Sequence, residues 1–239
     1  MWPSTFSLLP LISGAIAVAT IDTVFHNIYD GATDAGRVSD EQITRQMDVL
    51  NHSFRNAQLQ FRLSEVKPVD NAAWSRNQDS TAMKTQLHVG DAKQLNIYIL
   101  QDMGGKMAET TYPWDYARNP ELDGCSIIYS TLPGGETQDY NLGINLVHEV
   151  GHWLGLYDVA KGGKTCSYEG GDRVRDTAPQ VEGTVGCPKI PEDSCRDQWG
   201  PDNIHNFMDT SADRCRNDFT RGQIERMLEQ SARYRQIRI

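Results

Sequence analysis

Apolar positions switch between strand spacing and helix spacing along the first third of the chain. Residues 21–29 form a mostly apolar run that predicts a strand, and residues 59–69 alternate well enough to predict a second one. Between them, Ser39 and Gln42 have the pattern of a capping box, which opens a helix. The apolar residues that follow at helical spacing are Ile43, Met47, Leu50 and Phe54. We therefore expect this helix to bury one face.

Regular patterning continues through the middle of the chain and then stops. The predicted elements there are a short helix over residues 81–88, strands over 95–100 and 126–129, and a helix over 141–154. Residues 161–218 are rich in Gly, Pro, Asp and Cys. A segment of this composition is expected to be stabilised by disulfides more than by an apolar core. Thr220 then caps an amphipathic helix that runs to about Arg235. The sequence thus predicts one α+β domain of two lobes with a cleft between them.

The N-terminus carries a separate apolar stretch over residues 6–18. The small residues Ala17-Val18-Ala19 end it at the spacing that a signal peptidase prefers, although no Lys or Arg precedes it. We predict a signal peptide over residues 1–19 and a mature domain over 20–239. The alternative is a buried N-terminal helix. No second apolar run of spanning length follows, so the mature protein is expected to be soluble, secreted and extracellular.

Composition and cysteine content fit that compartment. The formal net charge is −9 without a long basic run, which argues against nucleic acid or an anionic membrane as the main partner. Of five cysteines, four lie in the last third: Cys166, Cys187, Cys195 and Cys215. Four cysteines allow three pairings, and their spacing does not choose among them. Cys125 is left without a partner among these four, either as a buried thiol or as an unpaired cysteine that is a liability to the protein. Asn51 begins the only glycosylation sequon.

Residues 148–152 carry the pattern of a metal-binding helix, HExxH. Residues i and i+4 of a helix share a face, so His148 and His152 can reach one zinc ion, and Glu149 can take a proton from its bound water. The alternative is two surface histidines without a metal. Gly155 follows where the helix must stop, and its turn brings Asp158 back as a third ligand. Three protein ligands and one open position are typical of catalytic zinc.

These residues and several later motifs resemble the metzincin zinc peptidases, and within them the pappalysin group. The resemblance covers nearly the whole mature chain, and its marks are HEVGHWLGLY at 148–157, GDRVRDT at 171–177, Gly186-Cys187-Pro188, Asp193-Ser194-Cys195 and Asn206-Phe207-Met208-Asp209. It implies a twisted mixed sheet with the active-site helix in the upper lobe. It also implies an irregular, disulfide-stapled lower lobe with a C-terminal helix. Met208 would be the methionine of the Met-turn beneath the zinc; the alternative is an ordinary core methionine.

The resemblance implies three further features. The disulfides would be Cys166–Cys195 and Cys187–Cys215. A calcium site would use Asp172, Val174 and Thr177; the alternative is a solvated acidic loop. The chain after the Met-turn would form a wall of the pocket for the residue after the cut bond. There, Asp213 and Arg214 are the candidate specificity residues, and Arg214 would disfavour Lys and Arg unless it points to solvent.

The chain departs from the family in three ways. It has Asp158 where the group has His, and Thr210 where the group has a tyrosine that helps to hold the transition state. Losing such a donor typically slows catalysis by roughly a hundredfold or more. Little sequence separates Ala19 from the strand at Ile21, so either no pro-segment is needed or the sequence lacks one.

We expect a secreted, monomeric zinc endopeptidase acting on proteins or peptides, with Glu149 as general base and zinc and calcium as its metals. The alternatives are a weakened or inactive metzincin-fold binding protein, based on Asp158 and Thr210, and a disulfide-stapled protein without a metal.

Overall fold

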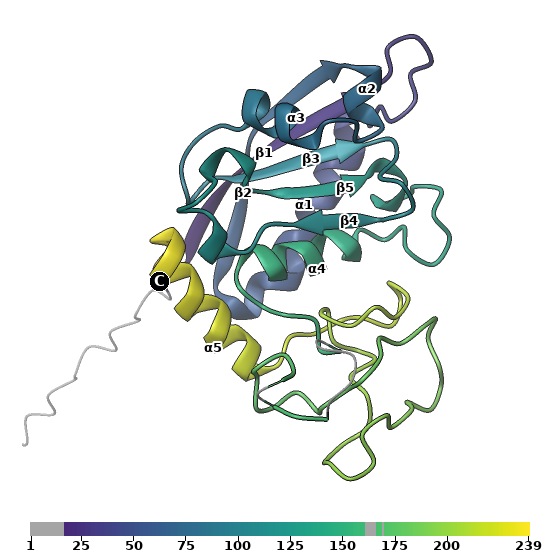
Figure 1. Cartoon of the computed structure of the whole chain (residues 1–239), viewed down its shortest axis with the longest axis vertical. Helices are drawn as coiled ribbons and strands as arrows, with labels where there is room; N and C mark the ends of the chain where they lie inside the picture. The colour runs from purple at the N-terminus through teal and green to yellow at the C-terminus, as the bar shows by residue number, and fades with distance from the viewer. Residues whose placement is uncertain (1–16, 161–165, 169) are drawn as a thin grey trace, which may run out of the picture.

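The computed structural model describes residues 17–160, 166–168 and 170–239 (Figure 1). Most of the predicted signal peptide, residues 1–16, lies outside these described residues. Ala19, the last residue of that predicted segment, begins the first strand. Within the described part of the chain, no helix has the length and apolar content that crossing a membrane requires.

The upper lobe is built on one five-stranded mixed sheet, which confirms the expected fold. Its strands are β1 (Ala19–Tyr29), β2 (Leu59–Asp70), β3 (Leu95–Leu100), β4 (Ala108–Thr110) and β5 (Cys125–Ile128). They lie in the order β2-β1-β3-β5-β4, all parallel except β4, which pairs antiparallel to β5 at the edge. The sequence pattern did not predict β4, because three residues are too few to show a period.

Helices cover both faces of the sheet. The central strand β3 is buried throughout, and its alternate residues join two different apolar clusters. Ile97 and Ile99 pack in the larger cluster with α1 (Asp40–Phe54) and α4 (Ile144–Trp153). Tyr98 and Leu100 pack in the smaller one with Met83 of α3 (Ser80–Leu87) and Trp74 of the short α2 (Ala72–Ser75).

The lower lobe is irregular, as its composition predicted. The described part of residues 161–218 contains no named helix or strand, and it runs below α4 in Figure 1. Two disulfides, Cys166–Cys195 and Cys187–Cys215, hold it together, which are the pairs that the resemblance implied. Cys125 is a free, buried thiol on β5, so the first of the two alternatives for it holds.

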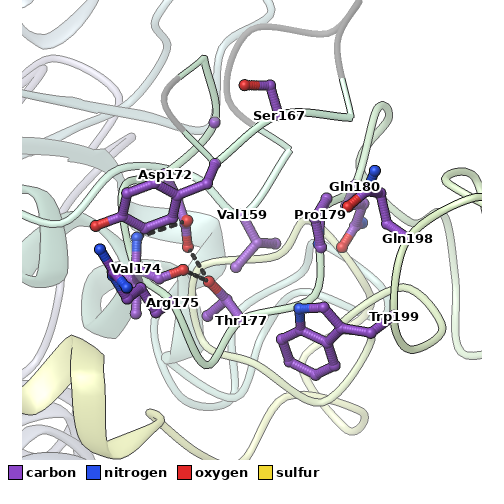
Figure 2. Close-up of a pocket in the computed structure, with 12 residues that line it drawn as sticks. Val159, Ser167, Asp172, Val174, Arg175, Thr177, Pro179, Gln180, Gln198 and Trp199 are labelled. Carbon is purple, nitrogen blue, oxygen red and sulfur yellow. Dashed lines mark hydrogen bonds between the residues drawn. The ribbon is translucent and has the colours of Figure 1, made fainter.

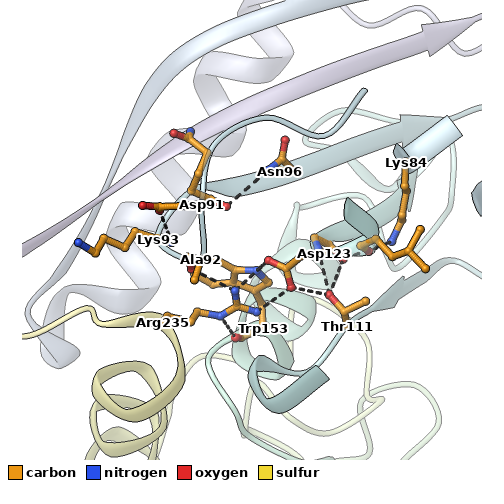
Figure 3. A network of polar contacts seen from close by, with 12 residues as sticks. Lys84, Asp91, Ala92, Lys93, Asn96, Thr111, Asp123, Trp153 and Arg235 are labelled. Carbon is orange, nitrogen blue, oxygen red and sulfur yellow. Dashed lines mark hydrogen bonds and ion pairs between the residues drawn. The ribbon is translucent and has the colours of Figure 1, made fainter. Parts of the chain in front are cut away.

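The C-terminal helix α5 (Arg221–Gln230) and the following π-helical turn (Ser231–Arg235) return to the upper lobe. Figure 3 shows how Arg235 ends this connection. Its guanidinium donates twice to the carboxylate of Asp123, at 2.8 and 3.0 Å, and once to the backbone oxygen of Trp153, at 2.8 Å. Because Trp153 follows His152 on α4, the end of the chain is tied directly to the helix that carries the HExxH motif.

Candidate active site

Helix α4 places His148 and His152 on one face, and a backbone carbonyl orients each ring. Nδ1 of His148 lies 2.9 Å from the oxygen of Phe207, and Nδ1 of His152 lies 3.0 Å from the oxygen of Leu156. A carbonyl oxygen only accepts hydrogen bonds, so each neutral ring carries its proton on Nδ1. Nε2 of each ring is left with a lone pair, as a metal ligand requires.

A sharp turn after α4 brings Asp158 to these two histidines. Gly155 adopts a φ of 102°, in the region that favours glycine, and a side chain there would also crowd Gln230. The Asp158 carboxylate then lies 2.9 Å from Nε2 of His148 and 3.3 Å from Nε2 of His152. The turn is fixed from below because Val159 donates its backbone N–H to the oxygen of Met208 at 3.1 Å.

The three side chains together fit a metal ion. One atom from each of His148, His152 and Asp158 can be chosen so that all three lie within 4.8 Å of one another. Two nitrogen lone pairs and a carboxylate oxygen repel each other unless a cation or protons lie between them. Protons can fill this role: burial raises the pKa of Asp158, but hydrogen bonds from the two histidines, when protonated at Nε2, outweigh it and hold the pKa well below its usual range. Two imidazoles and one carboxylate are a ligand set that suits zinc.

Glu149 follows His148 on α4 and borders a cavity. The residue is 8% exposed, and its Oε2 has no hydrogen-bond partner among the described residues. It lines a cavity of about 270 Å³ together with His148, Tyr140 and Thr210. A buried carboxylate oxygen without a partner, beside the candidate metal ligands, is positioned to accept a proton from a molecule in that cavity.

Met208, the methionine of the predicted Met-turn, packs against Gly151 of α4. It is fully buried in the apolar core, next to α4. The turn that presents it is held by Asn206, whose side-chain oxygen accepts from the backbone N–H of Met208 at 2.9 Å. The same amide side chain pairs in both directions with that of Gln223 on α5, at 2.8 and 2.9 Å. Two buried amides that bond each other in both directions therefore tie the turn to α5.

The structure brings together the three residues of the expected calcium site. The Thr177 hydroxyl donates to a carboxylate oxygen of Asp172 at 2.7 Å and lies 2.8 Å from the backbone oxygen of Val174 (Figure 2). Burial raises the pKa of Asp172 to about 6. These residues border a cavity of about 430 Å³, and the single hydroxyl hydrogen of Thr177 can bond only one of its two acceptors at a time.

Of the two candidate specificity residues, Arg214 points to solvent, which is the alternative left open for it, and Asp213 is buried. Arg214 forms an exposed ion pair with Asp139 and is not among the described residues that line the cavity beside Glu149. Asp213 is 2% exposed and pairs with Arg216 at 2.6 Å. Arg216 does line the cavity, and sequence reasoning missed it. Its spacing of three residues from Asp213 was the available signal, but that spacing alone does not indicate burial.

The side chains of Thr210 and Asn51, two other residues singled out from the sequence, are already hydrogen-bonded within the fold. The Thr210 hydroxyl donates to the backbone oxygen of Thr184 at 3.1 Å, so it is held within the lower lobe. Asn51 lies in α1, and its side-chain amide donates to the oxygen of Phe61 at 3.1 Å while accepting from its N–H at 2.7 Å. In the folded chain, the nitrogen that would carry a glycan is therefore already bonded.

Comparisons with known proteins agree with this geometry. A family model described as pregnancy-associated plasma protein-A matches residues 77–232. An extracellular metalloprotease of Colletotrichum graminicola is 40% identical over 225 residues, covering 92% of this chain and 79% of the relative. A second, from Pyricularia oryzae, is 42% identical over 219 residues, covering 90% and 76%. The structure of mature mirolysin from Tannerella forsythia, in complex with a cleaved peptide, is similar with a TM-score of 0.74 at 25% identity, covering 89% of this chain and 91% of that one.

Proposed function

The chain belongs to the pappalysin family of metzincin metallopeptidases, and from this premise we propose that it is a secreted zinc endopeptidase with Glu149 as its general base. That the chain is a zinc metalloprotease follows from its family. The ligand set, the base and the secretion of this chain are the proposal. The single observation that carries it is the convergence of His148, His152 and Asp158 beside the unpartnered oxygen of Glu149.

The proposed zinc ligands are Nε2 of His148, Nε2 of His152 and a carboxylate oxygen of Asp158. What supports this set is that both rings donate through Nδ1 to backbone carbonyls, which leaves the other nitrogen for a metal. When bound, zinc supplies Lewis-acid chemistry, because it lowers the pKa of water and polarises a peptide carbonyl. The anionic Asp158 in place of a neutral histidine would lower the net charge of the site.

Glu149 would move the proton in this reaction. Its unpartnered Oε2 would accept a proton from the attacking water and return it to the amine of the leaving peptide. His148 lies next to it on α4 and lines the same cavity, so the base would act beside the proposed metal site.

One observation favours a second candidate function, a binding protein with weak or no activity. Thr210 is too short to reach across the site, and its hydroxyl is bonded to Thr184 instead. Tyr140 offers a phenol near the same place, since its hydroxyl lies 3.3 Å from the backbone oxygen of Thr210 and its ring lines the cavity. Because Tyr140 could replace the missing tyrosine of the Met-turn, we propose an active enzyme in preference to a binding protein.

The remaining parts of the proposal concern processing and partners. We propose a signal peptide over residues 1–19 and a catalytic domain over 20–239, acting as a monomer on proteins or peptides. Relatives named extracellular metalloproteases support secretion. A calcium ion at Asp172, Val174 and Thr177 would have to replace the hydrogen bonds that now join them. Its binding would raise the melting temperature of the chelator-treated protein in proportion to added calcium.

Cleavage of a denatured protein tests the proposed function. The wild-type protein with one equivalent of zinc should cleave reduced, alkylated casein, and a chelator should abolish the cleavage. Glu149→Gln should bind zinc normally and lose nearly all activity, because only the base is removed. The matched control is Glu225→Gln, at an exposed position on α5 whose carboxylate pairs with Arg221. Equal activity of wild type and Glu149→Gln would contradict the proposal, and no activity in either would favour the binding protein.

A further inference from the structure

Arg216 is a buried cation at the wall of the cavity beside Glu149. The residue is 4% exposed, and it lines the cavity with Tyr140, Asn145 and Thr210. Its guanidinium donates to Asp213 at 2.6 Å, to Asn145 at 2.8 Å and to the backbone oxygen of Asp209 at 3.2 Å. Its Nε has no partner among the described residues. A guanidinium has five N–H donors, so these contacts leave part of its capacity unused.

Asp213 balances this charge but does not face the cavity. It is 2% exposed, and it is absent from the described residues that line the cavity. One of its oxygens accepts from Arg216, and the other accepts from the backbone N–H groups of Leu142, at 2.8 Å, and Ile144, at 3.4 Å. Both oxygens are therefore committed, and Asp213 offers no acceptor to a substrate.

Two cations, Arg216 and Lys106, line this cavity against one described carboxylate, that of Glu149, which is the proposed base. A lysine or arginine side chain entering it would meet the guanidinium of Arg216, while the carboxylate of Asp213 is already paired with that group and does not line the cavity. Desolvating such a cation without an acceptor is unfavourable. A carboxylate or carboxamide oxygen could instead accept a hydrogen bond from the guanidinium. Discrimination of this kind works by rejecting the wrong side chain as well as by binding the right one.

Because Glu149 and His148 line the same cavity, a side chain in it belongs to a residue next to the bond being cut. We propose that Arg216 determines specificity at this site, selecting Glu, Asp, Gln or Asn beside the scissile bond and rejecting Lys and Arg. This inference rests on the proposed function. It replaces Arg214, which pairs with Asp139 at the surface, as the residue that sets the preference.

Peptide profiling with matched variants tests this inference. Fluorogenic peptides would differ only in the residue on each side of one bond, with Gln, Glu, Leu or Lys there. The wild type should cleave the best Gln or Glu peptide at least about tenfold faster, as kcat/KM, than the Lys peptide. Arg216→Met uncovers an oxygen of Asp213, so the Lys-to-Glu ratio should rise by at least about tenfold. The control Arg214→Met should leave the ratio unchanged.

A double variant protects the test against misfolding, since Arg216→Met leaves a buried carboxylate unpaired. Arg216→Met combined with Asp213→Asn removes both charges and should lose discrimination between Lys and Glu. The inference is overturned if the wild type cleaves Lys or Arg peptides fastest. It is also overturned if whichever variant folds, judged by its circular dichroism and thermal transition, keeps the wild-type ratio.

A binding measurement separates this inference from the proposed function. Fluorescence anisotropy of labelled peptides with zinc-loaded Glu149→Gln reports selection without cleavage. Tighter binding of the Gln and Glu peptides than of the Lys peptide supports the role of Arg216, and the reverse order contradicts it. If the wild type cleaves no peptide at all, the proposed function fails while the anisotropy still decides the role of Arg216.

Discussion

The sulfur of Met208 lies against the backbone of Gly151, in the space that a side chain at position 151 would occupy. Gly151 is the residue before His152 on α4, and Met208 is fully buried beneath it. The two segments that build the site therefore approach to backbone contact, which only glycine permits. This contact fixes the distance between α4 and the turn that carries Met208.

Substituting Gly151 tests that contact. Gly151→Ala should destabilise the protein by about 1–3 kcal/mol through overpacking, even though alanine favours a helix. Met208→Ala alone should cost about 2–5 kcal/mol by leaving a cavity. The double variant should be more stable than the sum of the two losses predicts, because the new methyl group fills part of that cavity. Denaturant unfolding measures all four proteins. Strict additivity would show that the two residues do not compete for one space.

Asp158 is expected to be the third zinc ligand. Asp158→Ala should lower zinc affinity by at least about tenfold, because alanine offers no ligand atom. Asp158→His should keep or raise the affinity, because histidine supplies a nitrogen ligand in place of the carboxylate oxygen. Competition with a chromogenic chelator measures the affinity. Asp48→Ala, at an exposed position of α1, is the control and should have no effect. Full zinc affinity in Asp158→Ala would exclude Asp158 as a ligand.

Position 210 should limit the rate of the enzyme. Thr210→Tyr would place a phenol at the edge of the cavity and should raise kcat by roughly tenfold to a hundredfold, with a smaller change in KM. Thr210→Val removes only the hydroxyl that is bonded to Thr184, so it should change stability more than kcat. If kcat does not rise in Thr210→Tyr, Tyr140 is the phenol to test next, through Tyr140→Phe.

Only one of the five cysteines should react with a thiol reagent, and only after the protein is unfolded. Four are bonded in pairs, and Cys125 is buried with its thiol pKa raised above the usual value by desolvation. A thiol reagent should therefore detect no reactive cysteine in the native protein and one in the unfolded, unreduced protein. Two or more thiols after unfolding would show that a disulfide does not form. A reactive thiol in the native protein would show that β5 opens.

Arg235 should be required for the stability of the active-site helix. It is fully buried with Asp123 and also bonds the backbone of Trp153, so Arg235→Met leaves a buried carboxylate with fewer partners. The expected loss is about 3–5 kcal/mol of unfolding free energy. Arg62→Met is the control, because Arg62 pairs with Asp22 in the same two-point geometry at the exposed surface. Equal losses in the two variants would mean that burial does not decide the strength of the pair.

The sequence by itself determined the elements whose signals are local. The capping box of Ser39 and Gln42 opens α1, and the buried run over residues 95–100 is β3. His148 and His152 share a face because a helix repeats every 3.6 residues, whatever surrounds it. In each case, residues close in the chain carry the whole pattern, so no distant partner is needed to recognise it. The disulfide pairs came from resemblance, since spacing left three possibilities open.

The tertiary structure alone decided the features that depend on distant partners. The strand β4 exists because its three residues pair with β5, and the proton on Nδ1 of His148 is placed by the carbonyl of Phe207. Arg214 and Arg216 look alike in sequence, but one pairs with Asp139 at the surface while the other is buried with Asp213 beside the cavity that Glu149 lines. The physical reason is desolvation: the strength of a charge and its role depend on which groups exclude water from it, and the fold brings those groups together from remote parts of the chain.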